Sequence, residues 1–353
     1  MKRRIVGISR TSLWNAWKAI RKELRHATVR DVVDYLEYDI DPNVWIDRLL
    51  RQIADGTYEP RPPMRFTVAK SRGFSRRMTM PAIPDLVLYR AIGSYLQSRL
   101  KKHEHAHVYY ERAELNKAVQ QAQNEAKQEE GSKRGFWGKI VEFWMDYQSH
   151  SKRRQRAWLH YSQYRKHLIF TKVHQHIVTT DIANYFDTIL HSKLAECFHS
   201  LAAPPRMVGL LFFLLERMSI RAPFAESPHV GLPVDEFDCS RQLAHLFLYR
   251  HDDSMVATVG EEAYVRWMDD QNIGVESQAA GLRALAKVGE SLADLHLTAN
   301  AGKSRLLALA EARRHFHLDL NDELDAIEPI VRAKKPSVRQ IGKLVRAAWT
   351  KAN

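Results

Sequence analysis

Hydrophobic positions recur along the chain at two different spacings, and each spacing predicts one kind of element. Apolar residues at helical intervals predict helices over residues 11–24, 85–100, 191–201, 205–218, 240–253 and 279–295, with two short helices between the first of these and Gly56. Alternating apolar and polar residues predict strands over residues 64–70, 76–82, 174–182, 255–260, 263–268 and 305–310. The first two strands flank the tip Ser-Arg-Gly-Phe-Ser and form a hairpin. From residue 174 onward the pattern indicates an antiparallel sheet backed by helices, an α+β arrangement.

Residues 103–170 differ from the rest of the chain because they carry few strand signals and many basic residues. Ten Lys and Arg residues lie between positions 131 and 172, against only Glu142 and Asp146, and aromatic residues are interleaved with them. Taken alone, this pattern favours an amphipathic helical pair whose charges are solvated. The alternative is a nucleic-acid surface with cations on phosphates and aromatic rings on bases. That surface would include Lys152, Arg153, Arg154 and Arg156.

The charge balance points to a polyanionic partner. The 353 residues carry a net charge of +13, which suits nucleic acid or a membrane surface. The longest apolar run, residues 207–215, is far too short to span a bilayer, and the basic N-terminus has no apolar run behind it. Two cysteines, Cys197 and Cys239, are too few for a disulfide framework and favour a reducing compartment. We therefore expect a cytoplasmic protein that binds nucleic acid and no membrane.

Two adjacent aspartates interrupt the alternating pattern near the end of the chain. Asp269 and Asp270 fall where a two-residue hairpin turn belongs, directly after the predicted strand 263–268. An acidic turn is usually only a turn, but crowded carboxylates repel each other unless a cation lies between them. A third carboxylate, Asp181, ends the predicted strand 174–182. If the two strands are neighbours, Asp181 and Asp269 face each other and form a site for two Mg²⁺ ions, with Mn²⁺ as a substitute.

Five short motifs together resemble those of reverse transcriptases. The stretches D-I-x-x-Y-F-D (181–187) and W-M-D-D (267–270) are similar to the A and C motifs of that family. The other three resemblances follow the family's order along the chain: Lys70, Arg76 and P-A-I-P-D (81–85) resemble its fingers hairpin, G-L-P (231–233) with Ser240 and residues 243–248 its B motif, and L-T-A-N-A-G-K-S (297–304) its D motif. Any one of these matches alone is weak, but their order over residues 58–309 makes a strong signal.

The resemblance implies a right-hand polymerase fold of the α+β class, with an antiparallel-sheet palm, helical fingers and a short helical thumb. It divides the chain into N-terminal helices and fingers (1–102), a basic helical insertion (103–170), a palm that also holds fingers elements within 190–230 (171–310), and a thumb with a basic tail (311–353).

The resemblance also implies roles for the three carboxylates. Asp181 and Asp269 would be the principal metal ligands, with Asp270 beside them and the backbone carbonyl of Ile182 completing the set. Two metal ions in such a site, roughly 3.5–4 Å apart, activate a 3′-hydroxyl and stabilise the leaving pyrophosphate. Asp187 is expected to cap the following helix rather than to bind metal.

Four further residues would hold the incoming nucleotide. Phe186 would be the steric gate that leaves no room for a 2′-hydroxyl, so deoxynucleotides are expected. Lys70 and Arg76 would hold the triphosphate, and Lys303 would approach the leaving pyrophosphate. The alternatives are a plain core phenylalanine at position 186 and an ordinary surface lysine at position 303.

The B motif departs from the family pattern. The family usually has G-L-P-Q-G, whereas this chain has G-L-P-V-D, so that Gly231, Leu232 and Pro233 lead into Asp235 and Glu236. These two acids either accept hydrogen bonds from base amino groups and make base choice unusual, or merely cap the helix at 240–252. Ser240-Arg241 stands where group II intron and retron enzymes carry Ser-Pro, which points to the bacterial phage-defence and abortive-infection branch.

The predicted function is an RNA-directed DNA polymerase that adds dNTPs by a two-metal mechanism. Its partners would be dNTPs, a noncoding RNA template and a DNA product, in phage defence, with a second copy or a defence protein as further candidates. One alternative is a template-poor or protein-primed DNA polymerase of the same family. The other is an inactive RNA-binding scaffold on a polymerase fold, although a scaffold would not need three metal carboxylates and two triphosphate cations.

Overall fold

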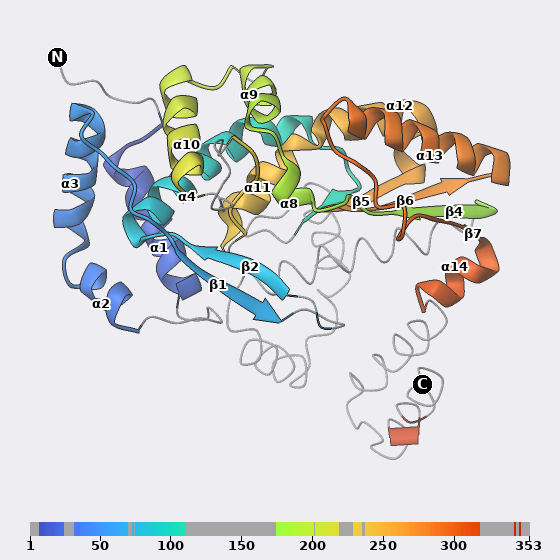
Figure 1. Ribbon diagram of the computed structural model, residues 1–353, viewed down its shortest axis with the longest axis horizontal. Coiled ribbons are helices and arrows are strands. Elements are labelled where there is room, and N and C mark those ends of the chain that lie inside the picture. The colour runs from blue at the N-terminus through green and yellow to red at the C-terminus, as the bar shows by residue number, and fades with distance from the viewer. Residues whose placement is uncertain are drawn as a thin grey trace, which may run out of the picture.

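The computed structural model describes residues 7–24, 32–69, 73, 75–110, 174–200, 202–218, 229–234, 237–317, 342, 343 and 346. Helices gather at the N-terminal end of the molecule and a sheet at the other end (Figure 1). The α+β class expected from the sequence is confirmed.

A five-stranded sheet forms one end of the molecule, with strand order β3-β5-β6-β4-β7. Its strands are β3 (Val108–Tyr109), β4 (His176–Thr180), β5 (Tyr264–Trp267), β6 (Asp270–Val275) and β7 (Arg305–Ala308). All neighbours pair antiparallel except β3 with β5, which is parallel. The central strands β4 and β6 carry Val178 and Ile273, both fully buried, because helices cover one face of the sheet.

Two long helices, α12 (Tyr249–Val259) and α13 (Gln278–Ala293), lie side by side on that face (Figure 1). Ser277 caps α13 by accepting the Ala280 N–H, which satisfies one of the unpaired donors at the helix start. Val288 and Leu292 are four residues apart and fully buried against the sheet. This packing places the edge formed by the β5–β6 turn toward the helical end of the molecule.

The helical end is built around α4 (Ile83–Leu100), whose residues 86–89 are all fully buried. The helices that surround it or lie near it are α1 (Arg10–Leu24), α2 (Val32–Ile40), α3 (Pro42–Asp55), α9 (His191–Ser200), α10 (Pro205–Met218) and α11 (Asp238–Phe247). Asp41 caps α3 and Gly56 ends it with a φ of 75°, so this helix has its start and stop signals in the sequence. The predicted helices over 11–24, 85–100, 191–201 and 205–218 are confirmed.

The predicted hairpin near residue 70 is also confirmed. Strands β1 (Met64–Ala69) and β2 (Ser75–Met80) pair antiparallel from Met64↔Met80 to Ala69↔Ser75. The Thr79 N–H donates to the Val234 carbonyl at 2.8 Å, which ties β2 to the loop before α11.

Two predictions about helices and strands are wrong. Residues 255–260 are not a strand, and 240–253 is not one helix: α11 ends at Phe247, and α12 runs on to Val259. Tyr249, Asp252 and Met255 are buried at three-residue intervals, so packing on the sheet decides for helix over the β-branched residues that follow.

The turn of the β5–β6 hairpin lies one residue earlier than predicted. Trp267 pairs with Asp270, so the turn residues are Met268 and Asp269, and Asp270 already belongs to β6.

The boundary predicted at residue 103 and the end of the last strand also shift. Residues 108 and 109 form β3, an edge strand of the sheet, rather than part of a helical insertion. Strand β7 ends at Ala308, where α14 (Leu309–His315) begins. The rest of the predicted insertion, and most of the C-terminal tail, lie outside the described residues.

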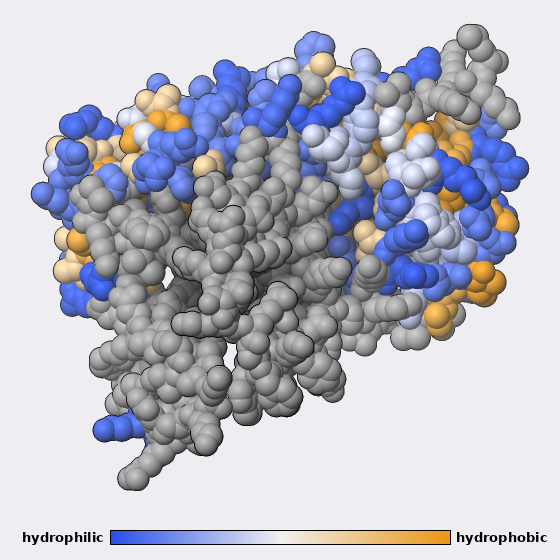
Figure 2. All heavy atoms as spheres, turned by 180° about the vertical axis from the view of Figure 1, so that it is seen from behind, coloured by the Kyte–Doolittle hydropathy of each residue, from blue (hydrophilic) through white to orange (hydrophobic). Residues whose placement is uncertain are grey.

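Within the described parts of the chain, no helix is both long and apolar enough to cross a bilayer. The described surface seen in Figure 2 is mainly hydrophilic, with small separated apolar groups.

Candidate active site

Asp181 lies directly after β4 and is held by the segment that precedes β7. It is 4% exposed. Its backbone carbonyl accepts the Asn300 N–H at 2.7 Å. Its Oδ2 accepts from Asn300 Nδ2 at 3.2 Å and from Lys303 Nζ at 2.6 Å. Asn300 therefore fixes both the backbone and the side chain of this carboxylate.

The sheet register brings the other two carboxylates to Asp181. Strands β4 and β6 pair antiparallel with Thr180 opposite Gln271, so the residue after Thr180 lies beside the start of β6 and the turn that carries Asp269. The predicted meeting of Asp181 with the β5–β6 hairpin is confirmed by this register.

Burial and like charge shape the titration of the pair on the hairpin. Burial, followed by the charge of Asp181, raises the pKa of Asp269 from 3.8 to about 7. The same two causes raise the pKa of Asp270, while the Lys303 ammonium partly offsets them. The pKa of Lys303 is raised in turn, chiefly by its hydrogen bond to Asp181. The cluster therefore favours added positive charge, whether a proton, an ammonium or a metal ion.

The donor set fits a hard divalent cation. Asp181 Oδ1 is buried and accepts no hydrogen bond. Carboxylate oxygens are the ligands that Mg²⁺ prefers, and it commonly takes only one or two of them together with substrate phosphates. Within the ranges that the structure describes, no three His, Cys, Asp or Glu side chains are arranged as a ready-made metal site. A cation bound here would therefore need oxygen ligands besides these carboxylates.

These carboxylates lie in a cavity of about 870 Å³. Among the residues that the structure describes, the charged ones that line it are Asp181, Asp187, Asp269 and Asp270 with Arg76, Arg77, Arg241 and Lys303. Arg241 is a cation whose Nη1 is buried without a hydrogen-bond partner. A cavity with both signs of charge can hold an anionic ligand together with the cations that neutralise it.

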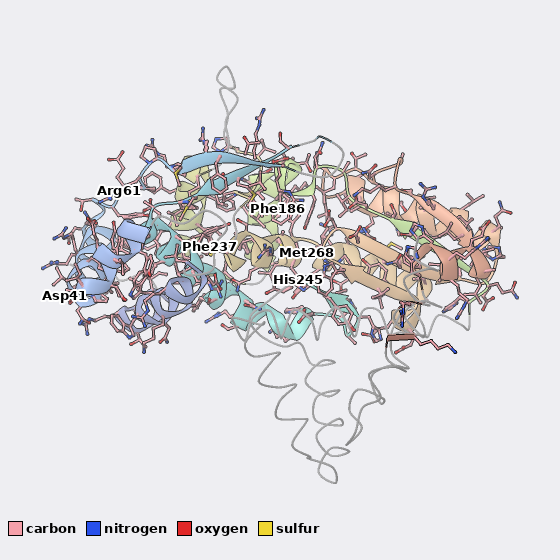
Figure 3. The ribbon with its side chains drawn as sticks, turned by 90° about the horizontal axis from the view of Figure 1, so that it is seen from below. Asp41, Arg61, Phe186, Phe237, His245 and Met268 are labelled. Atoms are coloured by element: carbon pink, nitrogen blue, oxygen red, sulfur yellow. The ribbon has the colours of Figure 1, made fainter. Side chains whose placement is uncertain are left out.

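Phe186 and the loop at Gly231 form a common wall of the cavity. Phe186 is on the short helix α8 (Tyr185–Thr188), whose Tyr185 turns inward and donates its hydroxyl hydrogen to the Ala244 carbonyl. Gly231 has a φ of 88°, and the next residue, Leu232, donates its N–H to the Phe186 carbonyl at 2.8 Å. In the view from below, Phe186 and Met268 both lie near the middle of the molecule, away from Asp41 at the helical end (Figure 3).

The cavity gathers most of the site residues that the sequence predicted within the described ranges. Asp181, Ile182, Phe186, Gly231, Leu232, Asp269, Asp270, Arg76 and Lys303 all line it. The hydrogen bonds of the Ile182–Ala299 bridge run from Ala183 N to Thr298 O and from Asn300 N to Asp181 O, so the Ile182 carbonyl takes no part in them. Pro233 is buried next to the lining residues.

Other predicted residues fall elsewhere. Lys70, Asp235, Glu236, Lys152, Arg153, Arg154 and Arg156 lie outside the described residues. The N-cap position of α11 is occupied by Phe237, so neither acid of the loop is the N-cap. Asp187 does not cap the next helix, because it lies inside α8 with its N–H bonded to the Asn184 carbonyl.

Sequence reasoning assigned no role to four residues that support the site: Asn300, Arg241, Arg266 and Asp252. Asn300 belongs to the motif 297–304 that also contains Lys303, so the sequence could have indicated its place near the site. Arg266 is a charged residue on the buried face of an alternating strand, which is itself a signal of a buried partner. Its partner, Asp252, could not be chosen from the acidic residues of the chain without the packing of α12.

Comparison with protein families gives one match over most of the chain. The family model described as "Reverse transcriptase (RNA-dependent DNA polymerase)" matches residues 83–342. Among solved structures, apo telomerase from Candida tropicalis, truncated from its C-terminal domain, is similar with a TM-score of 0.42 and 11% identity. The match covers 75% of this chain and 55% of the telomerase chain. No curated protein matches. The family match covers most of this chain and agrees with the order of the motifs and with the convergence of the three aspartates. The chain therefore belongs to the reverse transcriptase family of RNA-dependent DNA polymerases.

Proposed function

We propose that this protein is an RNA-directed DNA polymerase that adds dNTPs to a 3′ end by a two-metal mechanism. The observation that carries the proposal is the convergence of Asp181, Asp269 and Asp270, from two neighbouring strands, in one cavity that Arg76, Arg77, Arg241 and Lys303 also line.

Asp181, Asp269 and Asp270, with the Ile182 carbonyl, would hold two Mg²⁺ ions, which Mn²⁺ could replace. The ions supply activation of the 3′-hydroxyl and charge neutralisation at the leaving pyrophosphate. Removing water from the site increases the free-energy cost of keeping three adjacent carboxylates charged. The raised pKa of Asp269 agrees with a position that needs a cation.

The basic residues would bind the triphosphate. Arg76 and Arg241 line the cavity, and Lys70, the residue that follows β1 in the sequence, would join them. Lys303 has a side chain that is 62% exposed and is held by Asp181, so it can exchange this partner for a phosphate when a nucleotide and its metal enter. Phe186, on the cavity wall, would exclude the 2′-hydroxyl of a ribonucleotide.

The elements can be assigned to the parts of a right-hand polymerase. The five-stranded sheet with α12 and α13 would be the palm, and the β1–β2 hairpin with the N-terminal helices, α9 and α10 the fingers. The basic insertion would begin after Tyr110, because β3 belongs to the sheet. The chain beyond residue 311 would supply the thumb.

The template would be a bound noncoding RNA, and the biological role defence against phage in the cytoplasm. The net charge of +13 and the basic residues 131–172 support an RNA partner. The Ser240-Arg241 pair supports the defence branch, in which a second copy or a defence protein would assist. A template-poor or protein-primed polymerase is the second candidate, favoured by Asp235 in place of the usual glycine.

A dNTP incorporation assay, with and without RNase treatment of the purified protein, tests the proposal. The double variant Asp269→Asn/Asp270→Asn is expected to fold and to lose incorporation at least a thousandfold, since it removes two metal-ligand charges. The control Glu261→Gln/Glu262→Gln makes the same charge change at two adjacent exposed acids outside the cavity and should stay active. Incorporation by the folded Asp variant would refute the site.

The same assay separates the alternatives. Loss of incorporation after RNase supports a copied RNA, and persistence supports template-poor synthesis. RNA binding by a wild-type protein that incorporates no dNTP with Mg²⁺ or Mn²⁺ would instead support the inactive scaffold.

A further inference from the structure

The turn that carries Asp269 adopts a backbone conformation that its own sequence does not favour. Its first residue, Met268, has a φ of 55°. Two-residue hairpin turns with positive φ at this position normally use Asn, Asp or Gly, which tolerate the left-handed region. A methionine there must be held by its surroundings.

Two hydrogen bonds outside the β5–β6 ladder hold Met268. Its N–H donates to the Tyr109 carbonyl on β3 at 2.9 Å. Its carbonyl accepts from Arg266 Nη1 at 2.8 Å. The peptide that leads into Asp269 is therefore set by Arg266.

Arg266 is in turn fixed by an acid on a different element. Its side chain is fully buried, and so is that of Asp252 on α12. The guanidinium binds this carboxylate in bidentate fashion, with Nε to Oδ1 at 2.7 Å and Nη2 to Oδ2 at 2.5 Å. The Tyr264 hydroxyl also donates to Asp252 Oδ1, at 2.8 Å. Because a guanidinium is planar and rigid, fixing two of its nitrogens on Asp252 fixes the direction of the third.

The network continues on the far side of Arg266. Its Nη1 lies 3.5 Å from His245 Nδ1, and His245 Nε2 lies 2.8 Å from Glu104 Oε1. An arginine can only donate, so Nδ1 is the acceptor and Nε2 carries the hydrogen toward Glu104. Figure 3 shows His245 and Met268 close together at the middle of the molecule.

We propose that Arg266 is a positioning residue of the active site: held by Asp252, it fixes the Met268 carbonyl and thereby aims the Asp269 carboxylate at Asp181. Arg266 is not among the residues that line the cavity, so it acts through the turn and not on the substrate. The inference rests on the proposed function of the three carboxylates.

The test requires variants that keep the fold. Arg266→Met alone would leave a buried, uncompensated Asp252, which is strongly destabilising. The double variant Arg266→Met/Asp252→Asn removes both charges and leaves an acceptor for Tyr264. Arg266→Lys keeps the charge, but one ammonium cannot replace a fork that serves Asp252 and Met268 together. The control Arg90→Met/Glu23→Gln removes another largely buried pair, between α4 and α1, whose residues do not line the cavity.

Two quantities are measured on the full chain, together with the melting temperature. The first is Mn²⁺ binding without nucleotide, followed by the electron paramagnetic resonance of free Mn²⁺. The second is steady-state dNTP incorporation with Mg²⁺. For both Arg266 variants we expect Mn²⁺ affinity to fall at least fivefold and kcat to fall at least tenfold, which is about 1.4 kcal/mol, with KM for dNTP changed less than about twofold. The control should match wild type in both.

Wild-type Mn²⁺ affinity and kcat in the folded double variant would overturn the inference. Full kcat in Arg266→Lys would also overturn it, because charge without the bond to Met268 would then suffice. If the wild-type protein binds Mn²⁺ but incorporates no dNTP, the proposed function fails, and the Mn²⁺ measurement still decides the role of Arg266.

Discussion

At the scale of single residues, repulsion among the three carboxylates lowers the stability of the folded protein when no cation is bound. Asp181 is held by Asn300 and Lys303, whereas Asp269 has its pKa raised to about 7 by burial and by the charge of Asp181. Asn300 therefore holds Asp181 in place, whereas the proton that the cluster gains or loses near neutral pH belongs to Asp269 on the hairpin.

The first residue-scale prediction concerns stability and pH. The pKa of the Asp269 carboxyl is 3.8 when it is free of its folded surroundings and about 7 in the folded protein. The folded state therefore binds the proton more tightly than the unfolded state. The contribution of Asp269 to stability is full below pH 4 and is lost as pH rises through 7. Asp269→Asn should therefore stabilise the metal-free protein at pH 8, by at most about 4 kcal/mol, and hardly at pH 4.

Urea unfolding at pH 4 and pH 8 in the presence of EDTA measures this effect. Millimolar Mg²⁺ should then raise the stability of wild type at pH 8 and have less effect on the variant, because bound ligand stabilises the folded state. An equal shift of the variant at both pH values would contradict the prediction.

The second residue-scale prediction concerns sugar selection. Phe186→Val should admit ribonucleotides, because it shortens the side chain that stands on the cavity wall beside the carboxylates. Incorporation of rNTP relative to dNTP should rise tenfold or more. Phe198→Leu, which shortens a buried ring on α9 outside the cavity, is the matched control. An unchanged ratio in an active Phe186→Val protein would mean that this residue is not the gate.

At the scale of elements, the loop before α11 is held against α8 by backbone hydrogen bonds. The Gly231 N–H donates to the Ile189 carbonyl at 2.8 Å, and a Cβ added at position 231 would lie 3.4 Å from the Phe186 and Asp187 carbonyl oxygens. The positive φ of Gly231 opposes a side chain, whereas 3.4 Å is an ordinary van der Waals distance for a Cβ. Glycine at this position therefore allows the loop its left-handed turn beside α8.

The element-scale prediction follows from that backbone conformation. Gly231→Ala should cost about 1–2 kcal/mol of stability and raise KM for dNTP several-fold, because the loop and Phe186 move together. Gly56→Ala has a similar φ of 75° but open space around it and lies at the end of α3. It should show the stability loss, measured by denaturation, with no change in KM. Equal KM values for dNTP in the two variants would mean that the Gly231 loop does not take part in nucleotide binding.

At the scale of the whole molecule, the basic charge is distributed over the chain and should act through phosphates. RNA affinity is expected to fall steeply with salt, with a slope of about −0.7 to −0.9 per phosphate neutralised. Replacing Lys152, Arg153, Arg154 and Arg156 by Gln should reduce the slope by up to about three. A control replaces four exposed arginines on described helices, namely Arg48, Arg51, Arg250 and Arg283. If both sets change the slope equally, the segment is not a dedicated RNA surface.

The sequence by itself determined the chemistry and most elements of this protein. The three aspartates, the β1–β2 hairpin and a helix that ends near Gly56 follow from local patterns, since alternation, helical spacing and stop signals act within a few residues. Motif order then identified the family before any contact was known.

Only the tertiary structure decided how these parts meet. Residues 255–259 are helical because their stripe packs on the sheet, although their β-branched residues favour a strand. The hairpin turn consists of Met268 and Asp269 and not of Asp269 and Asp270. Contacts with Tyr109 and Arg266 stabilise Met268 in the left-handed conformation, which local propensity disfavours. The pairing of Arg266 with Asp252 has no local signal, since burial of a charge selects its partner by position in space and not by position in the chain.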